Sequence, residues 1–156
     1  MPPVFLDGIA RAVVLVHAIA ALVLVGAATH HAVVAIGLVR GAVRLRLARI
    51  YAATVAIAWT ASFALGLLAY PAFRVGVRAG YLDAAEPWAS NLFDIKEHVA
   101  ALGLPLVLGV FALSRRLEPR TDRALAGGYA ALVVLAAALA WIDVIAGLLV
   151  TMARGV

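Results

Sequence analysis

The four histidines are the residues of this chain best suited to chemistry, because they lie in or beside long apolar stretches. His17, His30 and His31 share the first stretch, and His98 ends the segment Asp94-Ile95-Lys96-Glu97-His98, which opens a later one. Ionisable side chains are costly at membrane depth, so each one in such a stretch is a candidate site residue. These residues define where the chain is expected to act.

Two neutral imidazoles from different helices of a four-helix bundle can ligate haem iron from opposite sides. His17 and His98 have the required residue type and, if both belong to helices, similar depths. His17 and His31 are 14 residues apart, which at ~100° per residue places them on one face of a helix, as in the ladder of membrane cytochromes b with two haems. A second, inner haem held by His31 would need a histidine at the same depth on another helix, and the chain has none. A single haem b held by His17 and His98 is therefore favoured over two.

The same residues allow other interpretations. His17, Glu97, His98 and Asp143 could serve as mixed nitrogen and oxygen ligands for copper, zinc or iron, with His17 and His98 as the principal metal ligands. Asp143 is a lone acid in the last apolar stretch, so we expect it to pair with His17, Lys96 or an arginine, or to carry protons. In the haem interpretation Asp143 and Glu97 are the expected proton acceptors. Any of the histidines could instead make a structural hydrogen bond or lie at an interface.

The composition predicts the elements that must position these side chains. Of the 156 residues, 66% are hydrophobic and only 13% are charged, whereas a soluble domain averages about 45–50% apolar and about 25% charged residues. The chain is therefore expected to be an integral membrane protein with a single domain, 1–156. Cysteine is absent, which excludes disulfides, thiolate metal sites and covalently attached haem. The net charge of +5 comes from arginines concentrated in two short loops, so we expect no nucleic-acid binding.

Four segments are long and apolar enough to span a bilayer as helices: 9–39, 48–72, 94–113 and 124–152. The predicted fold is an all-α integral membrane four-helix bundle. Pro71 is expected to end the second span and to open a long connection that reaches Phe93, with Ser90 or Asn91 capping the third helix. The N-terminus lacks the basic region of a signal peptide, so the first span is expected to be retained.

The arginines also predict an orientation. The loop between the first two spans carries Arg40, Arg44, Arg46 and Arg49, and the loop between the last two carries Arg115, Arg116, Arg120 and Arg123. Positively charged loops face the cytoplasm, so both termini are expected outside. His17 then lies ~12 Å deep in the outer half, near His98 and Asp143, while His30 and His31 lie ~20 Å further in.

Two short motifs are similar to those of a known family. The segments Val16-His17-Ala18-Ile19 and Leu92-Phe93-Asp94-Ile95-Lys96, together with Tyr51 and Gly66-Leu67-Leu68, resemble the HemJ-type protoporphyrinogen oxidases and related small four-helix membrane haem b proteins. The resemblance implies haem b, redox chemistry in the bacterial inner membrane, His17 as one axial ligand and Lys96 in place of the family's lysine. It supports haem binding and does not assign porphyrinogen oxidation.

Three functions follow as hypotheses. The first is a multi-pass haem b protein that exchanges electrons between a quinone or porphyrin-like molecule in the lipid bilayer and a partner at the outer surface. The second is a non-catalytic small subunit of a larger membrane complex, or a homo-oligomer, whose polar residues contact partner chains. The third is the non-haem metal-binding protein described above. For the opposite haem ligand, His98 is expected first and Lys96 second.

Overall fold

The computed structural model describes residues 5–42, 44–118 and 121–154, and in these ranges the regular structure is helical throughout. The elements follow in chain order: η1 (Asp7–Ile9), α1 (Ala10–Val39), α2 (Leu45–Ala72), η2 (Phe73–Leu82), α3 (Asp83–Ala85), α4 (Pro87–Arg115) and α5 (Arg123–Ala153). Among the described residues, four helices are long and apolar enough to cross a membrane, the second of them running without a break from Leu45 to Ala85. The predicted all-helical fold, with four helices long and apolar enough to span a membrane, is therefore confirmed.

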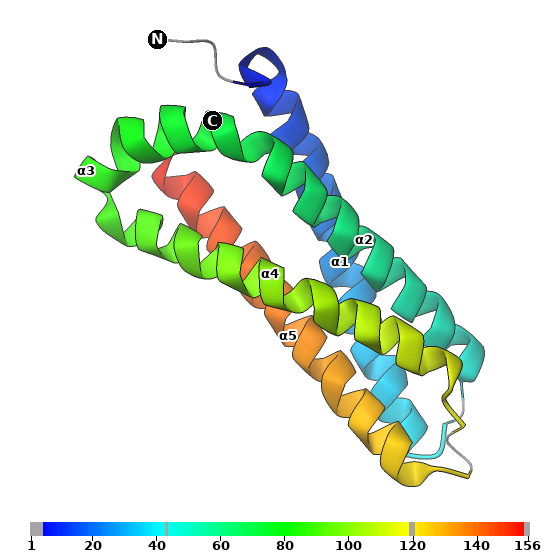
Figure 1. Cartoon of the computed structure of the whole chain (residues 1–156). Helices are drawn as coiled ribbons and strands as arrows, with labels where there is room; N and C mark the ends of the chain where they lie inside the picture. The colour runs from blue at the N-terminus through cyan, green and yellow to red at the C-terminus, as the bar shows by residue number, and fades with distance from the viewer. Residues whose placement is uncertain (1–4, 43, 119–120, 155–156) are drawn as a thin grey trace.

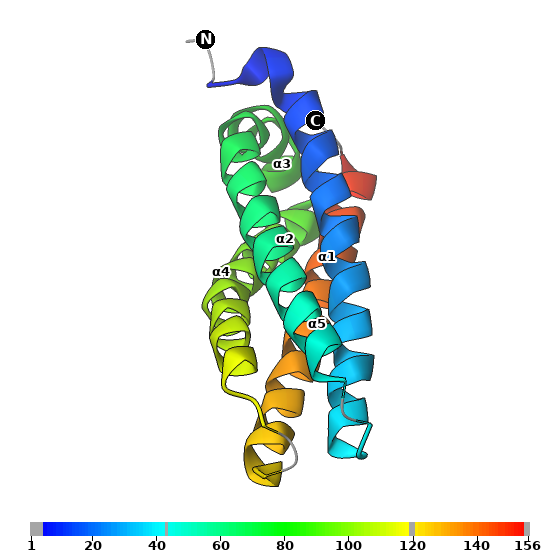
Figure 2. The ribbon, with the colours of Figure 1, turned by 90° about the vertical axis from the view of Figure 1, so that its right-hand side faces the viewer.

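The four long helices form an antiparallel bundle in which each packs on two others (Figures 1 and 2). α1 packs on α2 and α5, and α4 packs on the same two helices. We call the end where α1 begins and α5 ends the upper end, as drawn in Figure 1, and the opposite end the lower end. At the upper end η2 and α3 arch away from the bundle axis before α4 returns (Figure 1).

Alanine makes up much of the interior, beside a few large side chains such as Trp59 and Tyr129, and many large apolar side chains point outward. Ala35, Ala48 and Ala140 are fully buried, whereas Leu22 and Ile57 are 66% and 70% exposed. In a bilayer the lipid tails are as apolar as leucine, so helices associate through close packing of small residues. Small residues between the helices and large apolar residues on the outside suit a bundle that is surrounded by lipid.

The predicted ends of the first and fourth spans agree with α1 and α5 to within a residue. The long connection predicted from Pro71 to Phe93 is wrong, because the chain stays helical there except at Glu86. Pro71 lies inside the continuous helix, and the wider π-helix η2 begins two residues later. A proline ring crowds the preceding turn and removes one backbone hydrogen bond, and a change to π winding accommodates such a local defect.

The predicted cap of the third span is also wrong. α4 begins at Pro87, seven residues before the predicted start at Asp94, with Glu86 as the residue before the helix. Proline suits the first turn of a helix because its missing N–H would have no partner there. Ser90 lies inside α4, and its hydroxyl donates to the Asp83 carboxylate at 2.6 Å instead of capping a helix.

Candidate functional site

Each of the four long helices contributes one residue to a polar cluster in the upper half of the bundle. We define the polar cluster as His17 of α1, Ser62 of α2, Lys96 of α4 and Asp143 of α5. Ser62 and Asp143 are buried, and His17 and Lys96 are half-buried. Polar groups from four helices thus meet inside a bundle whose other interior residues are mostly small and apolar.

His17 is held in a defined orientation by α2. Its Nδ1 lies 2.8 Å from the Ser62 carbonyl oxygen, and because a carbonyl can only accept, Nδ1 carries the hydrogen and donates it. A neutral ring of this tautomer has its lone pair on Nε2. Gly66, one turn further along α2, lies against the ring, since a Cβ there would be in van der Waals contact with His17 Cε1 at 3.5 Å.

Lys96 and Asp143 form the charged part of the polar cluster. Lys96 Nζ lies 3.8 Å from Asp143 Oδ2, with side chains 16% and 12% exposed. The expectation that Asp143 is buried and paired is therefore confirmed, with Lys96 as its partner. Gly147, one turn above Asp143, makes room for the lysine, because a Cβ there would come within 3.1 Å of Lys96 Cε. The charges of both residues act on the His17 ring, so the three side chains form one electrostatic unit.

One polar atom of the cluster has no protein partner. Asp143 Oδ1 is buried and accepts no hydrogen bond from any described residue. A buried polar atom without a partner costs free energy, about 1–3 kcal/mol and more for a charged group. Such an atom is a place where a proton or a bound group would be accepted.

Three aromatic rings border the polar cluster toward the upper end. The Phe73 and Phe93 rings stack with centroids 4.2 Å apart, and Tyr70 stacks on Phe93 at 6.2 Å. Lys96 Nζ lies 6.0 Å from the centroid of Phe93. The aromatic group separates the charged pair from the end of the bundle.

The structure does not bring His98 to the polar cluster. Its ring is exposed, and Nδ1 donates to the Asp94 carbonyl of its own helix at 2.6 Å. Two positions along a helix correspond to ~200°, so a lysine at 96 that faces inward leaves residue 98 facing outward. Glu97 is half-buried beside them and forms no hydrogen bond or ion pair with another described residue.

The Asp94 carboxylate is bound by an arginine. It accepts two hydrogen bonds from Arg78 of η2, at 2.6 and 2.9 Å, and forms no hydrogen bond with the His98 ring. This bidentate pair joins η2 to the start of α4. Asp94 therefore has a structural role at the upper end.

His31 lies on the inward face of α1 as expected from its spacing with His17, but it has a partner of its own. It is buried, and its Nε2 lies 2.7 Å from the hydroxyl of Tyr129 on α5. The Tyr51 ring stacks on both His31 and His30. His30 is exposed and its Nδ1 donates to the Gly26 carbonyl at 2.8 Å. His31 would have to lose the Tyr129 contact to bind a cofactor through Nε2.

The non-haem metal site is not assembled. In the described ranges, no group of three or more histidines and acids lies close enough together to hold a metal ion. His17 and Asp143 belong to the polar cluster, while His98 points away from it. The sequence analysis did not identify Ser62 or Tyr129. Tyr129 carries a hydroxyl in an apolar stretch and could have been noticed, but Ser62 contributes a backbone carbonyl, which no residue type reveals.

Comparisons with known proteins give no relative. No family model, no curated protein and no solved structure matches the chain. Function is therefore inferred from the polar cluster and its contacts.

Proposed function

We propose that this chain is a membrane-embedded b-type haem protein that takes part in electron transfer or redox chemistry, with His17 as an axial ligand. The observation that carries the proposal is the hydrogen bond from His17 Nδ1 to the Ser62 carbonyl. Histidines that ligate metals almost always donate their other ring N–H to a carbonyl, carboxylate or water, which fixes the ring and the tautomer. The Nε2 lone pair of His17 is then available to iron.

The residues around His17 fit a haem. The His17 ring packs against the backbone at Gly66, the border is aromatic, and the nearby carboxylate of Asp143 has an oxygen without a partner among the described residues. The absence of cysteine requires non-covalent binding, which is the b type. A bound haem would supply one-electron transfer in a site of low polarity.

Lys96 replaces His98 as the preferred second ligand. It shares the bundle interior with His17, whereas His98 is exposed on the opposite side of α4. An amine must be neutral to bind a metal, and Asp143 Oδ2 at 3.8 Å from Nζ is placed to accept its proton. This agrees with the resemblance to the HemJ-type family, in which His17 and Lys96 match the family's histidine and lysine.

The other parts of the proposal concern the surroundings of the site. The substrate would be a quinone or porphyrin-like molecule from the bilayer. With Asp143 holding the proton of Lys96, Glu97 would take up the proton released from the substrate. The chain would lie in the bacterial inner membrane with both termini outside, so that the polar cluster is in the outer half. His31, which is bonded to Tyr129, is not part of this haem site.

The visible spectrum of the protein purified in detergent after expression with excess haem tests the proposal. We expect a Soret band that is lost in His17→Ala, shifted in Lys96→Met and unchanged in His98→Ala. His30→Ala is the matched control, because His30 lies on the same helix but is exposed and bonded to its own backbone. A colourless wild-type protein, or full haem content in His17→Ala, would reject the proposal.

One observation favours a second candidate, a subunit of a larger membrane complex. His30 is exposed well inside α1, and its neighbour Thr29 accepts a hydrogen bond at 3.0 Å from the exposed Trp141 of α5. Exposed polar groups in a lipid-facing region are expected where another helix covers them. Colourless protein that co-purifies with defined membrane subunits, and loses them in His30→Leu, would favour this candidate over haem.

A further inference from the structure

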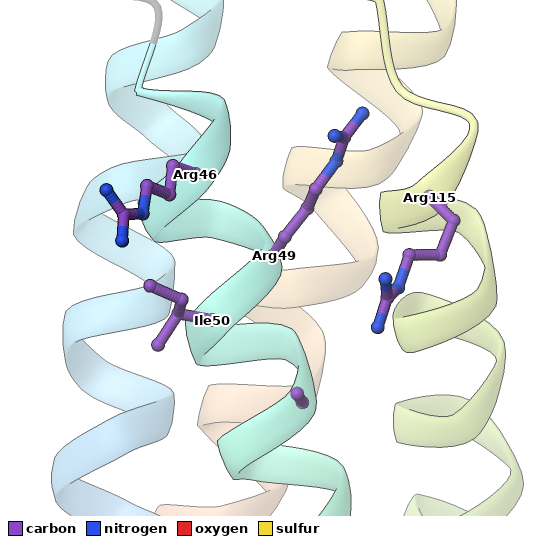
Figure 3. A pocket seen from close by; sticks show the side chains of 5 residues that line it. Arg46, Arg49, Ile50 and Arg115 are labelled. Carbon is purple, nitrogen blue, oxygen red and sulfur yellow. The ribbon is translucent and has the colours of Figure 1, made fainter.

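Three arginines line a cavity that is open to the outside at the lower end of the bundle. This open cavity has a volume of about 350 Å³, lies between α2 and α4, and is lined by Arg46, Arg49, Ile50, Ala53 and Arg115 (Figure 3). Arg49 extends from α2 toward the α4 side and Arg115 lies on the side of α4 that faces α2, while Arg46 projects from α2 in the direction away from α4 (Figure 3). Arg46 and Arg49 are one turn apart, so one helix contributes two charges and its neighbour a third.

The positive charge of this cavity is not neutralised within the described chain. None of the lining residues is acidic, and none of the three arginines forms an ion pair with a described carboxylate. Arg49 Nε donates to the Ser114 carbonyl at 3.2 Å, which leaves its terminal N–H groups available. The Arg115 guanidinium lies 4.9 Å from the Phe111 ring centroid, which steadies it over its own helix. The side chains of Arg49 and Arg115 are therefore already held in place before any ligand binds.

The lining changes from charged to apolar along α2. Arg46 and Arg49 lie in the first turns of the helix, and Ile50 and Ala53 follow one turn deeper into the apolar span. Guanidinium groups at a span end lie at the level of lipid headgroups, while residues one turn deeper meet the acyl region. A ligand that fills this cavity would be anionic at one end and apolar at the other.

We propose that this cavity binds the phosphate of an anionic phospholipid, with the glycerol and upper acyl chain against Ile50 and Ala53. Arginine presents planar, paired N–H donors that match phosphate oxygens, and basic pockets between membrane helices are suited to anionic headgroups. A free phosphate would satisfy the arginines but would leave the apolar part of the cavity unused. The site is separate from the polar cluster, which lies in the other half of the bundle, and the proposal does not depend on haem.

Native mass spectrometry and thermal unfolding of the full chain in detergent test the proposal, with three probes: phosphatidylglycerol, phosphatidylcholine and inorganic phosphate. We expect phosphatidylglycerol to be retained at least about tenfold more strongly than phosphatidylcholine, because each arginine near a lipid surface favours an anionic over a zwitterionic headgroup. Inorganic phosphate at equal concentration should leave the unfolding temperature almost unchanged. Equal retention of the two lipids would overturn the proposal, and an equal stabilisation by inorganic phosphate would reassign the cavity to the free ion.

Two charge-matched variants separate this site from general attraction to anionic lipid. Arg46→Gln/Arg49→Gln/Arg115→Gln removes the cavity arginines, and Arg40→Gln/Arg44→Gln/Arg116→Gln removes three arginines at the same end that do not line it. We expect the preference for phosphatidylglycerol to be lost only in the first variant. Equal loss in both would overturn the proposal. If the first variant does not fold, Arg49→Lys/Arg115→Lys keeps the charge but removes the paired donors, and an unchanged preference in that variant would overturn it as well.

Discussion

Asp143 and Lys96 are the most costly residues of the bundle interior, and each depends on the other. The carboxylate is buried on α5, its only described ion-pair partner is Lys96, and one of its oxygens has no hydrogen-bond donor. Removing one member of a buried ion pair leaves an uncompensated charge, which typically costs about 3–5 kcal/mol, whereas replacing both by apolar residues is often neutral. The two positions should therefore show strong non-additivity.

We predict that Lys96→Met lowers the thermal stability of the detergent-purified protein far more than the double variant Lys96→Met/Asp143→Leu does. Differential scanning fluorimetry of both, alongside the wild type, measures the effect. Glu97→Gln is the control, because Glu97 is the neighbouring acid without a described partner and should shift the midpoint little. Additive losses in the double variant would show that the two residues do not form a coupled pair.

Tyr129 and His31 make the second polar contact between α1 and α5. Both are buried, and the hydroxyl lies 2.7 Å from Nε2. Tyr129→Phe leaves the imidazole nitrogen without its partner in an apolar interior, so we predict a loss of about 1–3 kcal/mol in the free energy of unfolding. Chemical denaturation in mixed micelles measures it.

Tyr51→Phe is the matched control for that prediction. The Tyr51 ring stacks on His31, but its hydroxyl makes no hydrogen bond with a described residue. The two variants lose the same atom from similar rings, so only Tyr129→Phe should be destabilising. Equal effects would mean that the His31 contact contributes little.

At the scale of residues, the residue type and its expected depth in the membrane identified His17 and Asp143, but did not determine the other members of the polar cluster. His17 and Asp143 could be identified because an ionisable side chain in an apolar span is energetically costly and is usually retained for function. The choice between Lys96 and His98 depended on which side of α4 faces inward, and periodicity alone did not decide it in a helix that is apolar on most sides. The Ser62 carbonyl belongs to the backbone, which every residue type shares.

At the scale of elements, α2 and α4 approach closely at one glycine. Trp59 of α2 is buried, and its Nε1 donates to the Ala100 carbonyl of α4 at 3.0 Å. The ring then lies against Gly103, where an added Cβ would fall 1.9 Å from Trp59 Cζ2. Such a distance is a steric overlap, so the glycine sets how near the two helices can pack.

We predict that Gly103→Ala destabilises the bundle by about 1–3 kcal/mol, because the large indole ring or the α4 backbone must move. Gly109→Ala on the same helix is the matched control, since a Cβ there meets nothing within 4 Å. Alanine favours a helix by up to about 1 kcal/mol over glycine, so the control should be neutral or stabilising. Thermal unfolding of the two variants side by side checks this, and equal shifts would contradict the packing argument.

The long apolar stretches made the four spanning helices predictable, but the helical structure at the upper end of the bundle could not be predicted from the sequence. The sequence from Pro71 to Phe93 is charged and contains glycines, which favours a loop in a local interpretation. The helical arch there is held by side-chain contacts across its turn, above all the bidentate bond of Arg78 to Asp94 and the bond of Ser90 to Asp83. The local pattern of charged residues and glycines does not show which side chains will pair in this way.

At the scale of the whole molecule, the two ends of the bundle differ in charge. At the upper end, Arg78 lies within a network of acids, whereas the lower end carries the arginine-lined cavity without an acidic partner. The polar cluster lies in the upper half and the His31–Tyr129 contact lies nearer the lower end. The orientation of the chain in the membrane therefore decides which compartment each site faces.

We predict that the lower end faces the cytoplasm, because loops rich in arginine are retained on that side during insertion. Reporter fusions at Arg44 and at position 120, which lies outside the described residues, should read cytoplasmic, and a fusion at Ala84 of α3 should read external. The mixed charges near Ala84 give that segment no strong retention signal. An Ala84 fusion that reports from the cytoplasm would invert the bundle and place the polar cluster in the cytoplasmic half of the membrane.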